Sequence, residues 1–415
     1  MPRGMDLSRR SLLLAGAATM TMGRAWAATE SKPVEMAFVL PLSGPWARDG
    51  LLEREGAEMA VDDVNKSGGI KALGGAKMKL IIADAGDTPE KAKDATQRVI
   101  SQYPGLVAGA GCWLSSLTLA ATEVSERAHL PWLTLSYADS ITDRGFHYVF
   151  QTSPPGSTQA RQTLPAVIAV AVAATGKKPA TTMIITDNTA APLSVVKPMV
   201  EGGLLKKAGV KLLAEEIFTP PLSDATPLAQ KVRALRPDFL FQFTSNVPDD
   251  ALMLETLTEM GLPRSVLPVV GNGAHIVTPE LLKVAGKNIM DGVMTGVGNW
   301  PTKKAESLVE RFKKRTGEPW MGQDSISAYG HVMIVKWALE KTKVANREKV
   351  NAAIHAMGTS TGPADYFPGK VLKFDANGRR SGAPLVIVQW QNGTPVTVGP
   401  PEFAVAKAIW PKKAG

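Results

Sequence analysis

The 415-residue chain has few of the groups on which most enzymes, metalloproteins and disulfide-rich secreted proteins depend. Cys112 is its one cysteine, so no intrachain disulfide can form, and we expect it to be a small, buried core residue. The five histidines are scattered without metal-ligand spacing, which disfavours a metal site. Nucleophile-elbow, phosphate-loop and zinc-protease motifs are absent as well. We therefore expect no cofactor and no catalytic residues. A hydrolase assembled only by folding is a remote alternative.

Long apolar runs and concentrated charge are also missing. After the N-terminus, no apolar run reaches the length of a membrane-spanning helix. The formal charge is +9, but the basic residues are spread along the chain and are not interleaved with aromatic residues. This distribution excludes a nucleic-acid-binding tract and is typical of a solvated surface.

The N-terminus has the pattern of an export signal. Arg9 and Arg10 precede the apolar residues 12–18, and Ala25-Trp26-Ala27 offers a small-x-small cleavage site. We expect residues 1–27 to be a signal peptide, cleaved near Ala27, and the mature protein to be periplasmic. The paired arginines favour the twin-arginine route, with the ordinary Sec route as the alternative. The segment carries four arginines and one aspartate, so its removal lowers the charge from +9 to +6.

Strand-like and helix-like segments alternate along most of the chain, which is typical of a parallel sheet with crossover helices. Residues 34–40 form a nearly continuous apolar run, as expected for a strand covered on both faces. Ala57, Ala60, Val61 and Val64 recur on one face of a helix, and Gly68-Gly69 predicts where that helix ends. The same pattern predicts strands at residues 78–84, 106–109, 132–135 and 148–151, and a helix at 89–102.

The pattern restarts after residue 153, and two α/β halves of this size imply two lobes. The predicted helices cover residues 158–174, 194–208, 227–235 and 249–261, and the predicted strands 183–185, 211–218, 238–243 and 267–270. Three more helices follow at 303–316, 325–341 and 347–356, and then β structure at 370–375 and 384–390 with turns at Asn377-Gly378 and Asn392-Gly393.

Four short stretches occur in a distinctive order behind the export signal. They are residues 41–45 (PLSGP), residues 56–70 with the double glycine, residues 110–116 (AGCWLSS) followed by 130–136 (LPWLTLS), and residues 371–378 (VLKFDANG). In this order and spacing, the chain resembles the leucine/isoleucine/valine-binding family of type I periplasmic binding proteins. The resemblance covers about residues 34–398.

The resemblance implies an α/β fold with two doubly wound lobes joined by a three-strand hinge. It assigns residues 34–153 and 300–362 to lobe one, and residues 154–299 and 363–410 to lobe two. It further implies a monomer that captures a small-molecule ligand between the lobes and delivers it to the membrane permease of an ABC importer. A periplasmic sensor that feeds a signalling receptor has the same fold and is the main alternative.

In lobe one, the candidate ligand-binding residues lie in three loops. Ser115 and Ser116 precede a predicted helix, where hydroxyls and free N–H groups suit a carboxylate. They match the family's carboxylate-binding serines, and plain N-capping is a compatible role. The second ligand loop of the family matches Ser136, Tyr137 and Ala138, with Ala138 in place of a threonine. Trp46 follows a loop that lines the cleft in the family, and it packs on either an apolar ligand or the core.

In lobe two, the chain departs from the amino-acid-binding members of the family. The loop from Asp187 lacks their tyrosine, and residues 271–275 (GNGAH) lack their carboxylate for the ligand ammonium. A buried ammonium without a counter-charge is costly, so we expect Asn272 or His275 to face a carboxylate ligand without an amine, such as an aromatic or short organic acid. Asn246 is a further candidate. A structural turn role for His275 and an amino-acid ligand both remain alternatives.

Overall fold

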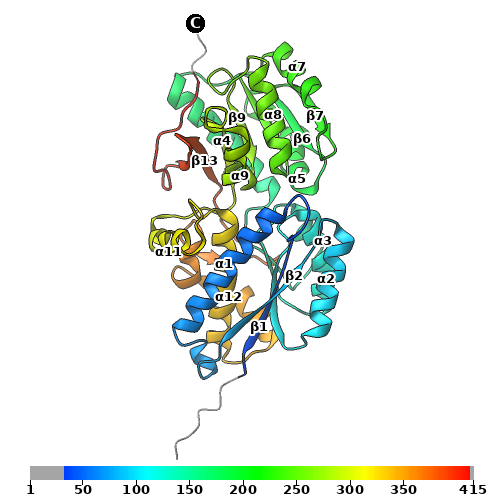
Figure 1. Cartoon of the computed structure of the whole chain (residues 1–415), viewed down its shortest axis with the longest axis vertical. Helices are drawn as coiled ribbons and strands as arrows, with labels where there is room; N and C mark the ends of the chain where they lie inside the picture. Colours follow the sequence, from blue (N-terminus) through cyan, green and yellow to red (C-terminus); the bar gives the residue numbers. More distant parts are fainter. Residues whose placement is uncertain (1–31, 412–415) are drawn as a thin grey trace, which may run out of the picture. The chain divides into compact units, whose positions relative to one another are not determined.

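The computed structural model describes residues 32–411, so the predicted signal peptide of residues 1–27 lies outside the described residues. The described chain forms two α/β lobes, each built on a sheet with helices on both faces (Figure 1). The predicted two-lobed α/β fold is therefore confirmed. None of the helices in residues 32–411 has both the length and the apolar composition needed to cross a bilayer.

The first sheet contains five parallel strands in the order β2-β1-β3-β4-β5. Its strands are β1 (Val34–Leu40), β2 (Met78–Asp84), β3 (Leu106–Gly111), β4 (Trp132–Thr134) and β5 (Val149–Gln151), and its connecting helices are α1 (Ala47–Lys66), α2 (Pro89–Gln102) and α3 (Ser115–Arg127). The strand order reverses between β1 and β3. Crevices at such a reversal, outside the carboxyl ends of the strands, are where open α/β sheets bind ligands.

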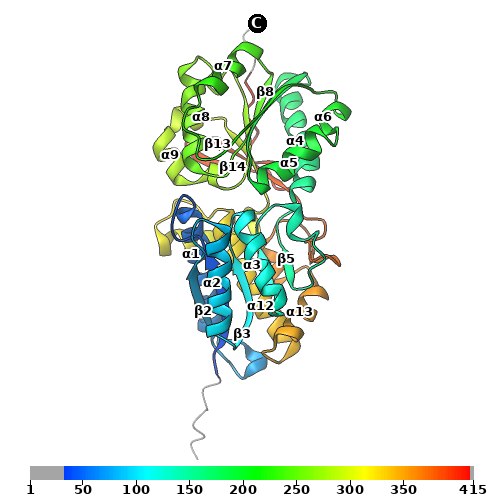
Figure 2. The same cartoon turned by 90° about the vertical axis from the view of Figure 1, so that its right-hand side faces the viewer.

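Strand β1 shows why its sequence is apolar at nearly every position. Met36 and Phe38 belong to the core on the α1 face of the sheet, whereas Ala37 and Val39 belong to the core beneath α2 and α3. Because successive side chains of a strand point to opposite faces, a strand covered on both sides has no polar face. Figure 2 shows α2 and α3 lying together over this second face.

The second sheet contains seven strands in the order β14-β13-β10-β9-β8-β6-β7. Its strands are β6 (Thr181–Asp187), β7 (Lys211–Phe218), β8 (Phe239–Phe243), β9 (Val269–Asn272), β10 (Met294–Val297), β13 (Val386–Gln391) and β14 (Thr394–Gly399), and its helices are α4 (Gly156–Thr175), α5 (Ala190–Val200), α6 (Leu204–Lys207), α7 (Thr226–Leu235), α8 (Val247–Glu259), α9 (Pro279–Ala285) and α10 (Lys287–Met290). Strands β6 to β10 are parallel, whereas β13 and β14 add antiparallel to the β10 edge.

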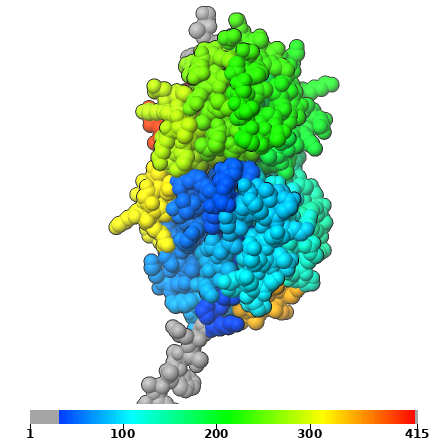
Figure 3. Space-filling model, turned by 45° about the vertical axis from the view of Figure 1, so that its right-hand side comes forward, coloured from blue at the N-terminus to red at the C-terminus, as the bar shows by residue number. Residues whose placement is uncertain are grey.

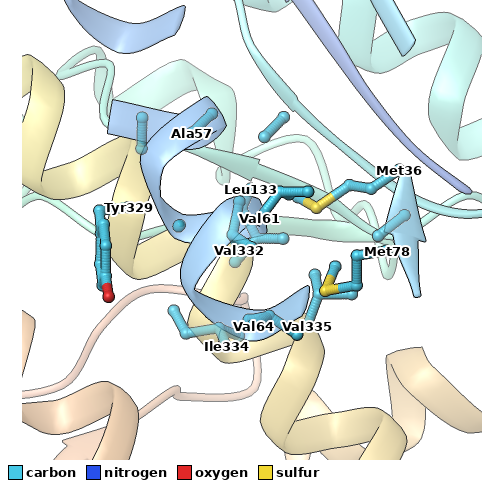
Figure 4. Close-up of a cluster of buried hydrophobic side chains, with 14 of the residues drawn as sticks. Met36, Ala57, Val61, Val64, Met78, Leu133, Tyr329, Val332, Ile334 and Val335 are labelled. Carbon is cyan, nitrogen blue, oxygen red and sulfur yellow. The ribbon is translucent and has the colours of Figure 1, made fainter. Parts of the chain in front are cut away.

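After β10 the chain returns to the first core. The helices α11 (Glu306–Thr316), α12 (Gln323–Thr342) and α13 (Arg347–His355) contribute buried side chains to the cluster that contains α1. Figure 4 shows Val332 and Val335 of α12 beside Val61 and Val64 of α1. The segment from Ala364 to Phe374, including β12 (Leu372–Lys373) paired with β11 (Gly358–Thr359), also contributes to this core, although the sequence places residues from 363 onward in lobe two.

The helices α1 and α12 cross at a glycine. A Cβ atom on Gly56 would lie 2.0 Å from the carbonyl oxygen of Ser325, which is far inside van der Waals contact. The hydroxyl of Ser325 donates a 2.8 Å hydrogen bond to the carbonyl of Leu52 on the same face of α1. The predicted apolar stripe and the double-glycine stop of α1 are confirmed, since its four predicted residues are buried and the helix ends at Lys66.

Two predicted elements differ from the structure, and several observed elements were not predicted. The predicted helix 194–208 is interrupted at Gly202-Gly203, where Gly203 adopts φ of 69° and separates α5 from α6. Strand β10 was not predicted, because Met294-Thr295-Gly296-Val297 is short and has no alternation. The predicted strand 370–375 is reduced to the two residues of β12. Short 3-10 turns occur at Lys71–Leu73, Asp139–Ile141, His275–Val277, Lys303–Ala305 and Gly362–Tyr366.

Candidate functional site

A cavity lies where loops from both sheets meet. Most of its wall comes from the segments that follow parallel strands, which is where α/β sheets place their ligands. Its lining residues are Trp113, Leu114, Ser115, Leu135, Ser136, Tyr137, Ala191, Pro192, Thr244, Ser245, Asn272, Gly273, Ala274, His275 and Gln323. Five of the ten candidate residues line this cavity, namely Ser115, Ser136, Tyr137, Asn272 and His275. His275 and Tyr137 are the only titratable side chains on its wall within the described chain.

The start of helix α3 forms one wall of the cavity. Its N-cap residue is Leu114, which has no side chain able to cap, so the N–H groups of the first turn are not satisfied by a cap. Ser115 is the first residue of the helix rather than its cap. Its Oγ accepts hydrogen bonds from the backbone N–H groups of Tyr137 (3.2 Å) and Ala138 (3.1 Å). Both bonds use Oγ as the acceptor, so the hydroxyl proton is available to a ligand.

Ser116 does not share this position. It is half-buried and does not line the cavity, although its backbone N–H belongs to the same uncapped turn. The positive end of the helix dipole and the unpaired donors still favour an anion at this wall. The structure therefore separates the two serines that the sequence treats alike.

The loop after β4 is committed to internal hydrogen bonds. Ser136 Oγ donates to the carbonyl of Trp113 at 2.6 Å and lies 2.6 Å from Thr118 Oγ1, so its proton is already used. Tyr137 donates its hydroxyl to Gln323 Oε1 at 2.6 Å, and burial raises its pKa above the ordinary tyrosine value. Ala138 is buried outside the lining and contributes only backbone groups. Ser136 and Tyr137 therefore offer a ligand mainly their surfaces.

Two other candidate residues have structural partners. Trp46 is half-buried and donates its indole N–H to the carbonyl of Ser245 at 2.9 Å, so it joins the loop before α1 to the loop after β8 instead of lining the cavity. Asn246 is the N-cap of α8: its Oδ1 accepts from the backbone N–H of Asp249 at 2.9 Å, and its Nδ2 donates to Asp249 Oδ2. It does not line the cavity either.

On the second-lobe side, Asn272 lines the cavity and donates its amide to Gln159 Oε1 at 2.7 Å. Asp187 lies behind the wall, where its Oδ1 accepts from the backbone N–H and the hydroxyl of Thr189. Its Oδ2 has no hydrogen-bond partner among the described residues, and burial raises the pKa of this carboxyl.

His275 is an ionisable side chain on the second-lobe wall. Its Nε2 lies 3.1 Å from Asp250 Oδ2, and its ring meets the indole of Trp113 edge-on with 6.0 Å between centroids. The other oxygen of Asp250 accepts from Thr244 Oγ1 and Gln242 Nε2, which fixes the carboxylate. Burial lowers the pKa of His275, but the nearby carboxylates, Asp250 first, outweigh it and raise the pKa above the ordinary histidine value.

The sequence analysis missed four residues around the cavity. They are the acids Asp49, Asp250 and Asp324 and the amide Gln323. Asp324 accepts a 3.0 Å hydrogen bond from the indole of Trp113, and Gln323 lies on the wall. Burial, followed by repulsion from Asp324, raises the pKa of Asp49 to about 8, and burial raises that of Asp324 to about 6. Carboxyls do therefore approach this region, but from α1, α8 and α12 rather than from the loop that the family uses.

One of these acids left a signal in the sequence. Asp49 and Glu53 precede Ala57 at spacings of four residues, so both acids fall on the apolar stripe of α1 and both are buried. An acid on an apolar stripe indicates either a paired charge or a raised pKa. No comparable signal exists for Gln323, which contacts Tyr137 across 186 residues of chain.

Within the part of the chain that the structure describes, no three His, Cys, Asp or Glu side chains gather as metal ligands. Cys112 is buried, as predicted. On the face shown in Figure 3, the blue surface of the α1 region lies directly against the green surface of the second lobe. Trp46 and Arg48 make this contact in detail, since Trp46 donates to the carbonyl of Ser245 and Arg48 forms an ion pair with Glu280 of α9 at 2.9 Å.

Residues 33–395 match the family described as periplasmic binding protein. This chain belongs to that family. Leu/Ile/Val-binding protein homolog 7 of Brucella suis is 29% identical over 398 residues, covering 94% of this chain and 96% of that protein. The fold of this periplasmic binding protein is shared by solved solute-binding proteins.

Two solved structures illustrate the likeness of fold. A leucine-binding protein of Thermotoga maritima superposes with a TM-score of 0.75 at 20% identity, covering 89% of this chain and 99% of its own. A solute-binding protein of an R. palustris ABC transporter, solved with benzoate, superposes with a TM-score of 0.71 at 18% identity, covering 91% and 98%. The resemblance identified from the sequence is confirmed at the level of family and fold.

Proposed function

We propose that this protein is the periplasmic substrate-binding component of an ABC importer of the branched-chain amino acid type, and that it binds a small carboxylate in the cavity. The observation that carries the proposal is the uncapped start of α3, with the Ser115 hydroxyl proton left free, on the wall of an otherwise largely apolar cavity. Unpaired N–H groups, a helix dipole and a hydroxyl donor together favour a carboxylate.

The wall also limits the chemistry of the ligand. Trp113, Leu114, Leu135 and Pro192 supply apolar surface for the body of a small molecule. Relatives support this class, because they are named for leucine, isoleucine and valine, and one of the similar structures holds benzoate. We infer that the ligand is a small carboxylate with an apolar body, either an amino acid or an organic acid.

The remaining parts of the proposal concern organisation and location. We infer that lobe one comprises β1–β5 with α1–α3 and the returning helices α11–α13, and that lobe two comprises the seven-stranded sheet with α4–α10. We further infer that the chain is exported, that it acts as a monomer without catalytic activity, and that its partner is the membrane permease. Ser115 and His275 are the side chains that we place in ligand contact.

A thermal-shift screen of the mature protein tests the proposal. The screen contains aliphatic carboxylates, aromatic carboxylates and branched-chain amino acids, with the matching amides and alcohols as controls. We expect a carboxylate to raise the melting temperature by several degrees, whereas the amide and alcohol with the same body give no shift, because binding to the native state alone stabilises it. Equal shifts with carboxylate and amide would contradict the anion site at α3.

A further inference from the structure

The wall opposite helix α3 contains a polar atom without a partner. His275 is 2% exposed, it lines the cavity, and its Nδ1 has no hydrogen-bond partner among the described residues. A buried, unsatisfied ring nitrogen costs free energy, and such atoms are rare in native proteins. Because His275 lines the cavity, a bound molecule can supply the missing partner.

The surroundings of the ring determine whether Nδ1 donates or accepts. Nε2 lies 3.1 Å from Asp250 Oδ2 and 3.5 Å from Thr244 Oγ1, and a proton on Nε2 suits the nearby carboxylate. Asp249 and Asp324 are stabilised in their charged forms by the ring, whereas Asp49 and Asp187 favour the charged ring only when they are themselves ionised. Arg48 acts on Asp49 and Asp324, and Asp250 is the group that most favours the imidazolium. In the imidazolium, both ring nitrogens carry protons, so Nδ1 is a donor.

The loop before His275 is built to hold the ring in this place. Gly273 has φ of +118°, and a Cβ atom on it would lie 2.8 Å from Nδ1 and 2.7 Å from Cε1 of the ring. A side chain at position 273 would therefore displace the imidazole and also strain the backbone. Asp250, held by Thr244 and Gln242, fixes the opposite side of the ring. A ring positioned from both sides is suited to specific recognition.

We propose that His275 recognises a second hydrogen-bond acceptor on the carboxylate ligand, so that the preferred substrates are hydroxy, oxo or dicarboxylic acids rather than α-amino acids. This inference rests on the proposed function, because it assumes that a carboxylate occupies the α3 wall. An acceptor group satisfies Nδ1, whereas an ammonium would meet a cationic donor on this wall. The carboxylates near the ring are not among the residues that line the cavity.

Calorimetric titration of the mature protein with matched ligands tests this proposal. One set is 4-methylpentanoate, 4-methyl-2-oxopentanoate and leucine, and the other is benzoate and 4-hydroxybenzoate. In the wild type, we expect at least one acceptor-bearing acid to bind about tenfold or more tighter than its parent acid, as a hydrogen bond to a charged donor predicts. In His275→Phe, we expect this advantage, taken as the ratio of the two affinities in the same variant, to fall below about threefold.

Two further variants guard against a merely structural effect. His275→Gln retains an N–H donor and should recover part of the preference. His331→Phe is the matched control, because His331 is also buried with an unpartnered Nδ1 but does not line the cavity, so it should leave the preference unchanged. In a crystal structure with the tightest acid of the panel, its second acceptor should lie about 2.7–3.2 Å from Nδ1.

The outcomes separate this inference from the proposed function. If the parent and acceptor-bearing acids bind equally, the role of His275 is overturned while carboxylate binding stands. The same holds if leucine binds most tightly and His275→Phe does not change that order. Tight leucine binding would make Asp187 the first candidate for an ammonium contact. If no carboxylate of either set binds, the proposed function fails and the role of His275 fails with it.

Discussion

The indole N–H of Trp46 donates a 2.9 Å hydrogen bond to the backbone carbonyl of Ser245, and so connects the loop before α1 to the loop after β8. The first loop belongs to the five-stranded sheet, and Ser245 both follows a strand of the seven-stranded sheet and lines the cavity. The ion pairs of Arg48 with Glu280 and Glu318 are close to the same contact. The two lobes are therefore joined beside the cavity by direct polar contacts.

Loss of this contact should weaken ligand binding. Trp46→Phe keeps an aromatic ring but removes the donor, and one such hydrogen bond contributes about 0.5–1.5 kcal/mol. We expect the affinity for the carboxylate found by the thermal-shift screen to fall about two- to tenfold. We also expect the variant with ligand to have a larger radius of gyration than the wild type with ligand, closer to that of the ligand-free protein. Calorimetry and small-angle scattering measure the two effects. Trp337→Phe, a half-buried tryptophan of α12 remote from the cavity wall, is the control and should change neither.

The two serines at the start of α3 should differ in their effect on binding. Ser115→Ala removes the free hydroxyl proton and the acceptor for two backbone N–H groups, so we expect carboxylate affinity to fall about tenfold or more. Ser116→Ala removes a half-buried hydroxyl outside the lining and should cost less than about threefold. Titration calorimetry of both variants is decisive, because equal losses would show that the contact lies in the backbone of the turn alone.

The stability of the ligand-free protein should fall as pH rises. Burial raises the pKa of Asp49 to about 8, so the native state keeps a proton that the unfolded chain loses near pH 4. Unfolding thus releases a proton between these values, and the free energy of unfolding decreases with pH by up to about 1.4 kcal/mol per unit. The raised pKa of His275 acts in the same direction, with its contribution lost as pH rises above its ordinary range.

Asp49→Asn should reduce this slope because the amide carries no titrating proton. Urea unfolding of wild type and variant at pH 5, 6 and 7 measures the difference, and we expect the variant to lose visibly less stability over the series. Asp94→Asn, on the exposed face of α2, is the matched control and should keep the wild-type slope. A variant with an unaltered slope would mean that Asp49 is ionised in the native protein.

The crossing of α1 and α12 predicts an unusual penalty for adding one methyl group. Gly56→Ala would normally stabilise a helix by about 1 kcal/mol, but its Cβ would lie 2.0 Å from the carbonyl of Ser325. We expect the variant to be destabilised by about 1–3 kcal/mol, measured by denaturant unfolding. Gly358→Ala, where a Cβ atom would meet open space, is the control. Equal stability of the two variants would show that the helices separate at little cost.

The export signal makes a prediction that concerns the residues outside the described structure. N-terminal sequencing of the exported protein should begin at Ala28, after the Ala25-Trp26-Ala27 site. Replacement of Arg9 and Arg10 by lysine should block export through the twin-arginine route. Unchanged export of this variant would assign the protein to the Sec route instead, and an exported protein that retained residue 1 would exclude cleavage.

Much of the fold is determined by local sequence patterns. The apolar run of β1, the stripe of α1 and the Gly68-Gly69 stop each follow from properties of neighbouring residues, and each is found in the structure. Alternating strands and helices were enough to indicate two α/β lobes. Local patterns failed where a glycine interrupted them, as at Gly203 between α5 and α6 and at Gly296 within β10.

The roles of the site residues depend on partners that are distant in sequence. Sequence alone placed Ser115, Ser136 and Asn246 in equivalent positions after strands or before helices. The tertiary structure commits Ser136 to the carbonyl of Trp113, 23 residues away, and Asn246 to capping α8, whereas Ser115 keeps a free proton beside the cavity. A hydroxyl has one proton to donate, and only the folded structure decides which acceptor receives it.

The charge of the cavity wall was also decided only by folding. The sequence correctly indicated that residues 271–275 contain no carboxylate, but it could not show that Asp49, Asp250 and Asp324 approach His275 from three different helices. Electrostatic interactions depend on distance and burial, and neither is encoded in a local pattern. The sequence therefore determined the family, the two lobes and the region of the cavity, while the tertiary structure determined which side chains there are free to bind.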